Sequence, residues 1–273
     1  MKKKFLNLCL TTVLAFSLLT GCGAAATDES SADVEVAEEA VSESEDEVTE
    51  DEVTSDEATE ADTSEADTQT EDNEAAAQQL LVDLTGSYQE LWPVILDDKY
   101  EQVWLDNCEV LVGEENAQAA YEKLASMVSG EIYGEEAVEA YADGNGVYDC
   151  HFTENVAKLE FDGSEARIKG YDANGEELFS HTYHYVGMEE VRGLYEYESD
   201  DADSGEFTYF CIAPDTSATT YHIELRYGSD LDKLGQYDNG EYAYWLGSGI
   251  AVDCDQTMIE NCIQLFCEEN LAQ

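Results

Sequence analysis

The sequence is short of proline and positive charge, and its first third almost lacks aromatic residues. It contains two prolines, and 11 lysines and arginines stand against 64 aspartates and glutamates, a formal net charge of −53 at pH 7. A phosphate backbone would be repelled by this surplus of carboxylates, so the composition argues against nucleic acid as a partner. A cation or a basic partner is the electrostatically favoured ligand.

No aromatic residue lies between Phe16 and Tyr88, and no lysine or arginine lies within residues 28–74. That stretch holds 22 aspartates and glutamates in 47 positions. Such a segment cannot bury enough apolar surface to offset its chain entropy, so it is predicted to stay disordered. Because like charges repel, we expect residues 23–74 to form an extended acidic tether. A loose cation sponge is the alternative interpretation of the same carboxylates.

The N-terminus has the parts of an export signal. Three lysines open the chain after the first methionine, residues 5–19 are mostly apolar, and Gly21-Cys22 follows. The apolar run is shorter than the roughly 20 residues of a membrane-spanning helix. Its Gly-Cys ending resembles the lipobox of bacterial lipoproteins, in which the cysteine is acylated and becomes the mature N-terminus. We expect residues 1–22 to be a signal peptide with lipidation at Cys22, which anchors the chain at the extracytoplasmic face of the cell membrane. An ordinary signal with a chance cysteine is the alternative.

Residues 75–273 have the composition of one folded domain. They contain all three tryptophans and all 17 tyrosines, and about 200 residues suffice for a hydrophobic core. Their six cysteines form no Cys-x-x-Cys motif, which leaves a zinc ribbon unsupported. In an exported protein this even number permits up to three disulfides in 15 pairings. Cys262 and Cys267 are five positions apart on a predicted helix and face different directions, so they pair elsewhere or remain free.

Hydrophobic spacing predicts helices at both ends of this domain and strands between them. Apolar residues recur at helical spacing in residues 74–82, 86–96, 114–129 and 255–271. Asp253 or Asp255 would cap the last helix, and Pro93 would break the second or occupy its first turn. Alternation of apolar and polar residues predicts strands at residues 156–161 and 166–171, and further strands fit residues 178–186, 191–197, 207–213 and 221–227.

Asp162-Gly163 and Asn174-Gly175 separate alternating runs, and such pairs are strong hairpin signals. Sequential strands joined by tight turns commonly close into a barrel. The predicted fold is therefore mainly β with flanking helices. It is an antiparallel barrel of about six strands, with N-terminal helices before it and a C-terminal helix after it. Small barrels of this kind often hold a ligand in the mouth or interior.

Three stretches, in order along the domain, are similar to the ZinT (YodA) family. Residues 83–93 resemble the family's Asp-x-x-Gly-x-Trp opening and the Tyr-Pro that follows, with Tyr88 and Trp92 exchanging the two aromatics. Residues 155–196 resemble its Val-x-Lys-Ile, Tyr-Lys-Tyr-Val-Gly and Val-Arg-Tyr-Leu-Phe-Glu sequence, and residues 212–230 resemble a third stretch that begins Ile-Ala-Pro. The resemblance implies a lipocalin-type (calycin) barrel that binds zinc outside the cytoplasm. It also implies a role in zinc acquisition, since related domains are fused to the zinc-binding lipoproteins of ABC importers.

The resemblance also indicates where a metal would bind. In the family, one histidine precedes Ile-Ala-Pro and a His-x-His pair follows on the next strand; these positions hold Phe210, His222 and Glu224 here. Residues i and i+2 of a strand face the same way, and glutamate is a legitimate zinc ligand, so His222 and Glu224 are the expected zinc ligands. A shifted register, with Thr220 and His222 as the pair, would lose more of the site. Phe210 cannot bind a metal, and the candidates for a third donor are Cys211, His184, His181 and His151.

Two functions remain after the enzyme motifs are considered. Gly-x-Ser-x-Gly, His-Glu-x-x-His and a phosphate-binding glycine loop are all missing from the sequence, so no enzyme is predicted. The first function is zinc capture, or delivery to a zinc ABC importer, by a lipid-anchored protein. It expects His222 and Glu224 to meet a third donor inside the barrel. The alternative is a degenerate ZinT-like barrel without metal that serves as a surface-interaction or small-ligand module. In that case Phe210 would fill the former site with apolar packing.

Overall fold

A computed structural model describes residues 63–142, 146–214, 218 and 220–272 of the chain. The predicted signal peptide, Cys22 and the tether as far as residue 62 lie outside these residues. Within the described ranges, no helix has both the length and the apolar character needed to cross a bilayer.

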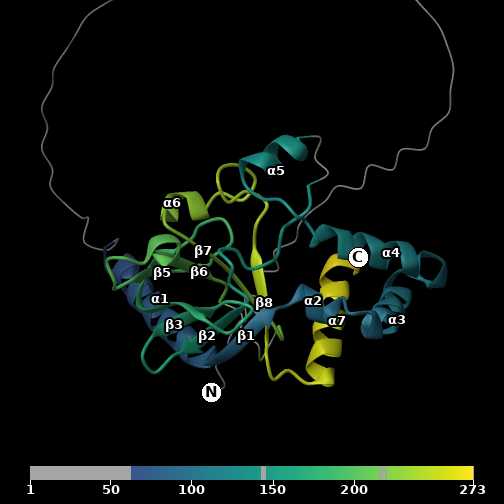
Figure 1. Cartoon of the computed structure of the whole chain (residues 1–273), viewed down its shortest axis with the longest axis horizontal. Helices are drawn as coiled ribbons and strands as arrows, with labels where there is room; N and C mark the ends of the chain where they lie inside the picture. The colour runs from purple at the N-terminus through teal and green to yellow at the C-terminus, as the bar shows by residue number, and fades with distance from the viewer. Residues whose placement is uncertain (1–62, 143–145, 215–217, 219, 273) are drawn as a thin grey trace, which may run out of the picture.

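Eight antiparallel strands form a closed barrel. Each strand pairs with the next one in sequence, and β1 also pairs with β8 to close the ring. This architecture confirms the predicted fold class, an antiparallel barrel with flanking helices. Figure 1 shows the barrel strands on one side of the molecule and α3, α4 and α7 gathered on the other. The strands are β1 Gly86–Glu90, β2 Lys158–Asp162, β3 Arg167–Tyr171, β4 Glu177–Met188, β5 Tyr195–Ser199, β6 Tyr209–Ile212, β7 Ile223–Gly228 and β8 Gly247–Ala251.

The barrel has two strands that the sequence pattern did not predict. Residues 86–96 were expected to be helical, but Gly86–Glu90 form β1 and the helix α2 is restricted to Trp92–Ile95. The reason is cross-strand packing, because Tyr88 is buried and its ring meets that of Phe161 edge-on at 5.6 Å. Strand β8 reads Gly-Ser-Gly-Ile-Ala, in which Ile250 is the one β-branched residue and no aromatic residue occurs, so its sequence is not that of a typical strand.

The helices agree with the predictions in part. Helix α4, Glu114–Met127, and helix α7, Gln256–Leu271, match the expected ranges closely, and Asp255 caps α7 by accepting a hydrogen bond from the Met258 amide at 2.9 Å. Helix α1, Thr63–Asp83, ends where expected but begins inside the acidic segment predicted to be disordered. Acidic residues are favoured near a helix N-terminus, where they interact with the helix dipole. Helices α3 Glu101–Val112, α5 Glu135–Ala140 and α6 Leu231–Leu234 were not predicted.

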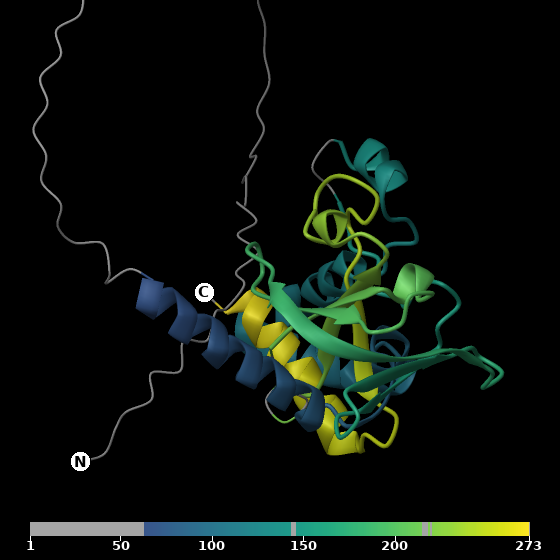
Figure 2. The same ribbon diagram turned by 90° about the vertical axis from the view of Figure 1, so that its left-hand side faces the viewer.

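The buried apolar side chains form two cores. The first fills the barrel and extends to α1, where the Tyr197 hydroxyl donates a hydrogen bond to the Ala77 carbonyl at 2.8 Å. Helix α1 packs against β2 and β4, and Figure 2 shows it as a long helix lying beside the barrel. The second core lies between α2, α3, α4 and α7, and it includes Ile250 of β8. A strand residue whose neighbours in sequence point into the barrel core therefore directs its own side chain toward the helices or toward solvent.

Candidate metal site on strand β7

His222 and Glu224 lie close together at the start of β7. Nε2 of His222 is 3.8 Å from Oε1 of Glu224. Nδ1 of His222 is 2.7 Å from the Thr220 carbonyl oxygen, so the neutral ring donates its Nδ1 proton there and keeps its lone pair on Nε2. Histidines that bind metals are commonly held in this way by a hydrogen bond from the other ring nitrogen.

The pair lies on the outer face of the barrel. Ile223 and Leu225 belong to the barrel core, so Glu224, which alternates with them, points outward. Glu224 pairs with Ser248 of β8. On the outside, Cys262 of α7 lies against the histidine, with its Sγ 3.9 Å from Nδ1 of His222.

This placement differs from the expected meeting of three donors inside the barrel, because strand alternation turns the pair away from the interior. Among the described residues, no three or more histidine, cysteine, aspartate or glutamate side chains are grouped so that they could hold a metal. The side chains of His222 and Glu224 are 17% and 40% exposed, so solvent reaches the pair from the glutamate side.

The two side chains stabilise each other's charge. Burial alone would lower the pKa of His222, but its interactions with Cys262 and Glu224 outweigh burial and raise that pKa well above its ordinary value of 6.5. Burial alone would raise the pKa of Glu224, but the hydrogen bond with His222 and the charges of His222 and Arg192 lower it. Without a metal, the pair is therefore an imidazolium–carboxylate ion pair at neutral pH.

Replacing His222 with glutamine is expected to cost stability mainly in mildly acidic solution. The raised pKa of His222 gives stability that is fully present below its ordinary value and is lost as pH rises through the folded value. The lowered pKa of Glu224 gives stability that is present above its ordinary value of 4.5 and is lost as pH falls through the folded value. The pair therefore stabilises the fold most between these two ordinary values. Because Glu224 is partly exposed, the effect should stay below about 1 kcal/mol.

Urea unfolding of the wild type and the His222→Gln variant measures this difference. The loss should be larger at about pH 5.5 than in alkaline solution, because the stability that the imidazolium contributes is lost as pH rises through its folded pKa. A loss that is equal at both pH values, or larger in alkali, would contradict the ion-pair assignment.

The other three histidines are held through Nδ1 by aspartates. His181 stacks on Phe179 and its side chain is 16% exposed, whereas that of His184 is 53% exposed. Because the two histidines are three positions apart on β4, their side chains face opposite sides of the strand, which agrees with this difference. The Nδ1–oxygen distances are 3.0 Å for His151 with Asp149, 2.9 Å for His181 with Asp201 and 2.8 Å for His184 with Asp200.

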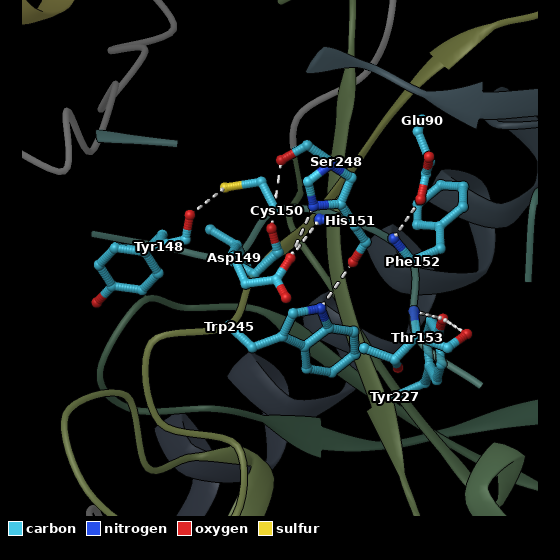
Figure 3. Close-up of polar contacts among 11 residues, drawn as sticks. Glu90, Tyr148, Asp149, Cys150, His151, Phe152, Thr153, Tyr227, Trp245 and Ser248 are labelled. Carbon is cyan, nitrogen blue, oxygen red and sulfur yellow. Dashed lines mark hydrogen bonds and ion pairs between the residues drawn. The ribbon is translucent and has the colours of Figure 1, made fainter. Parts of the chain in front are cut away.

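The Asp149–His151 pair, shown in Figure 3, is a feature that the sequence analysis did not single out. Asp149 is buried, and one of its oxygens accepts hydrogen bonds from both the amide and the ring of His151, each at 3.0 Å. The hydrogen bond to Asp149 raises the pKa of His151 against the effect of burial. Trp245 donates a hydrogen bond from Nε1 to the His151 carbonyl at 2.8 Å and so fixes the segment. An Asp-x-His spacing is the sequence signal that could have identified the pair.

Neither the last candidate for a third donor, Cys211, nor Phe210, which stands where the family has a histidine, completes a metal site. Phe210 is fully buried inside the barrel, where its ring lies 5.2 Å from those of Tyr183 and Tyr227. Cys211, the next residue, points to the outer face and is 1% exposed. Burial is the largest cause of its raised pKa, which keeps this thiol neutral. Neither residue joins His222 and Glu224 in a metal-binding group.

Comparison with solved structures finds chains of similar fold. The chain is similar to the Zn(II)-bound ZinT-like domain of Streptococcus pneumoniae AdcA, with 17% identity, a TM-score of 0.42, and coverage of 68% of this chain and 89% of that domain. It is also similar to Zn(II)-bound AdcA from the same organism, with 18% identity, a TM-score of 0.38, and coverage of 71% of this chain and 35% of AdcA. No protein-family profile and no curated protein sequence matches the chain. At these identities the likeness concerns the fold.

Proposed function

We propose that the chain is a lipid-anchored extracytoplasmic protein that captures zinc at His222 and Glu224 and passes it to a zinc importer. The observation that carries this proposal is the approach of two metal donors, Nε2 of His222 and Oε1 of Glu224, to 3.8 Å. Zinc bonds to imidazole nitrogen and carboxylate oxygen are about 2.0–2.2 Å long, so one ion can touch both atoms. The hydrogen bond from Nδ1 to Thr220 leaves Nε2 available for the metal.

A site with two protein donors suits transfer better than storage. Closed structural zinc sites use four protein ligands, and open ones use three with a position left for water or substrate. With only His222 and Glu224 on the protein side, water or a partner's side chain would complete the coordination. Because Glu224 is 40% exposed, an acceptor protein could approach the ion from that side. We propose binding and transfer of the metal as cargo, without catalysis.

The N-terminal part of the chain supports the cellular part of this proposal. The lipobox-like Gly21-Cys22 would place the domain on the outer side of the membrane, and the tether would let it reach a neighbouring importer. The many carboxylates would also attract cations to the protein surface. The importer as recipient is what the ZinT-like stretches of sequence imply.

Calorimetric titration of zinc into residues 23–273, which leave out the signal peptide and Cys22, tests the metal site. We expect one-to-one binding, weakened roughly tenfold or more by His222→Ala because half of the protein ligand set is lost. Glu224→Gln should weaken binding as well. The matched control is His184→Ala, which removes an exposed, aspartate-paired histidine on another strand and should leave the binding unchanged. Binding that is equal in the wild type and the His222→Ala variant would overturn the assignment.

The second candidate is a barrel without metal that acts as a surface-interaction module. Two observations favour it: Phe210 fills the barrel interior, and Val186, Met188 and Val191 around the β4–β5 connection are 40%, 45% and 66% exposed. Apolar side chains exposed near one another are typical of interaction surfaces. A titration without one-to-one zinc binding would favour this function over the first.

A further inference from the structure

Two cysteines face each other between α3 and α7. Cys108 lies four residues after Trp104 on the buried side of α3, and Cys267 lies four residues after Ile263 on the buried side of α7. Both cysteines are 0% exposed and belong to the core between the helices. Helices α3 and α7 pack side by side, as Figure 1 shows. Each thiol influences the pKa of the other, so the two sulfurs lie near each other in this shared core, and both cysteines are free thiols in the structure.

We infer that Cys108 and Cys267 form a disulfide that links α7 covalently to α3. A disulfide requires two cysteines whose side chains point toward each other across a short gap, and facing positions on packed helices meet that condition. The other cysteine of α7, Cys262, is turned toward His222 instead. The sequence spacing left 15 pairings open for six cysteines. The packing of the two helices selects the Cys108–Cys267 bond, which leaves three pairings for the other four cysteines.

The bond would form by thiol–disulfide exchange while the chain folds. One cysteine thiolate attacks a low-molecular-weight disulfide, which gives a mixed disulfide and releases one small thiol. The second cysteine thiolate then attacks the mixed disulfide, closes the protein bond and releases the second small thiol. The protein loses two electrons and two protons, and the small disulfide gains both. Because the folded protein buries both sulfurs and burial raises the pKa of each thiol, exchange must occur before the helices dock.

The disulfide would fix the position of helix α7, which lies against the candidate metal site. Helix α7 carries Cys262, which touches the His222 ring, so fixing α7 to α3 also fixes the outer side of that ring. The closed loop runs from residue 108 to residue 267 and includes most of the barrel. A cross-link over so long a loop restricts the unfolded chain strongly. The inference does not depend on zinc binding and would stand if the zinc proposal failed.

Refolding residues 23–273 in a mixture of reduced and oxidised glutathione tests the inference. After free thiols are blocked and the protein is digested, mass spectrometry should find one peptide that joins Cys108 to Cys267. Reduction of the folded protein with dithiothreitol under mild denaturation should lower the midpoint of thermal unfolding by about 10 °C.

Two variants make the result specific. Cys108→Ala should abolish both the linked peptide and the effect of reduction on the unfolding midpoint. Cys211→Ala, which removes an equally buried thiol on β6, should keep both. Recovery of Cys108 and Cys267 as blocked free thiols, or in bonds to other cysteines, would overturn the inference, because that result is read from the wild type and needs no variant to fold.

Discussion

Replacing Arg226 with methionine is expected to reduce the free energy of unfolding by about 3–4 kcal/mol. Arg226 lies on the outer face of β7 and is fully buried. Its guanidinium donates hydrogen bonds to the carbonyl oxygens of Leu234, Gln236 and Tyr242, and it stacks over the Tyr237 ring at 4.4 Å. Methionine would fill much of the same volume but leave all three carbonyls without this donor, and each unsatisfied buried acceptor is costly.

In the Arg226→Met variant, the segment between β7 and β8 should lose its structure before the rest of the protein does. Three of its carbonyls depend on one side chain, so the Arg226→Met variant should be cut by protease within residues 229–246 faster than the wild type. Urea unfolding gives the change in free energy. Lysine should not rescue the variant, because its single ammonium cannot reproduce the planar fork of donors. The matched control, Arg167→Met, removes a partly exposed arginine that pairs with Glu165 and should change stability by less than about 0.5 kcal/mol. A loss as small as that of the control would show that Arg226 does not hold the segment.

Much of the barrel could be predicted from local patterns. Strands β2 and β3 alternate buried and less buried residues along their whole length, and a tight turn joins them. In such a hairpin the hydrophobic alternation and the turn chemistry specify the same structure. Helix α7 combined a capping aspartate with an apolar stripe, and its start was predicted to within one residue.

The strands that close the barrel could not be predicted in this way. Strand β1 owes its conformation to Tyr88, whose ring packs against a residue more than 70 positions later in the sequence. In β8, Gly249 packs closely against distant residues, because a Cβ there would lie only 3.1 Å from the side chains of both Ile223 and Phe152. Contacts between distant parts of the chain decided both strands, and single-sequence patterns carry only local information.

Local sequence patterns also left part of the candidate site undetermined. Alternation correctly placed His222 and Glu224 on one side of a strand, but it could not tell the inner from the outer face of the barrel. That choice follows from Ile223 and Leu225, whose side chains fill the interior. The contact of Cys262 with His222 joins residues 40 positions apart and depends on how α7 docks.

Replacing Phe210 with histidine is expected to destabilise the barrel without strengthening zinc binding. The variant would place a histidine at the position where the ZinT-like sequence stretches imply one. Phe210 pairs with Tyr227 across β6 and β7, and Tyr227 lies on the face of β7 opposite to Glu224. A histidine at position 210 would therefore point into the barrel, away from Nε2 of His222. Burying a polar ring among Tyr183, Tyr227 and Phe179 should cost about 2–4 kcal/mol.

Zinc titration and thermal unfolding of the Phe210→His variant, beside Phe210→Leu, test this expectation. Phe210→Leu keeps the position apolar, so it should lose less stability than Phe210→His and bind zinc as the wild type does. If the variant is folded and its zinc affinity is unchanged, the metal site is on the outer face, built on His222 and Glu224 alone. A gain of tenfold or more in affinity, which corresponds to about 1.4 kcal/mol, would instead mean that the three positions converge. The zinc site would then lie inside the barrel, and the outward placement of Glu224 would be wrong.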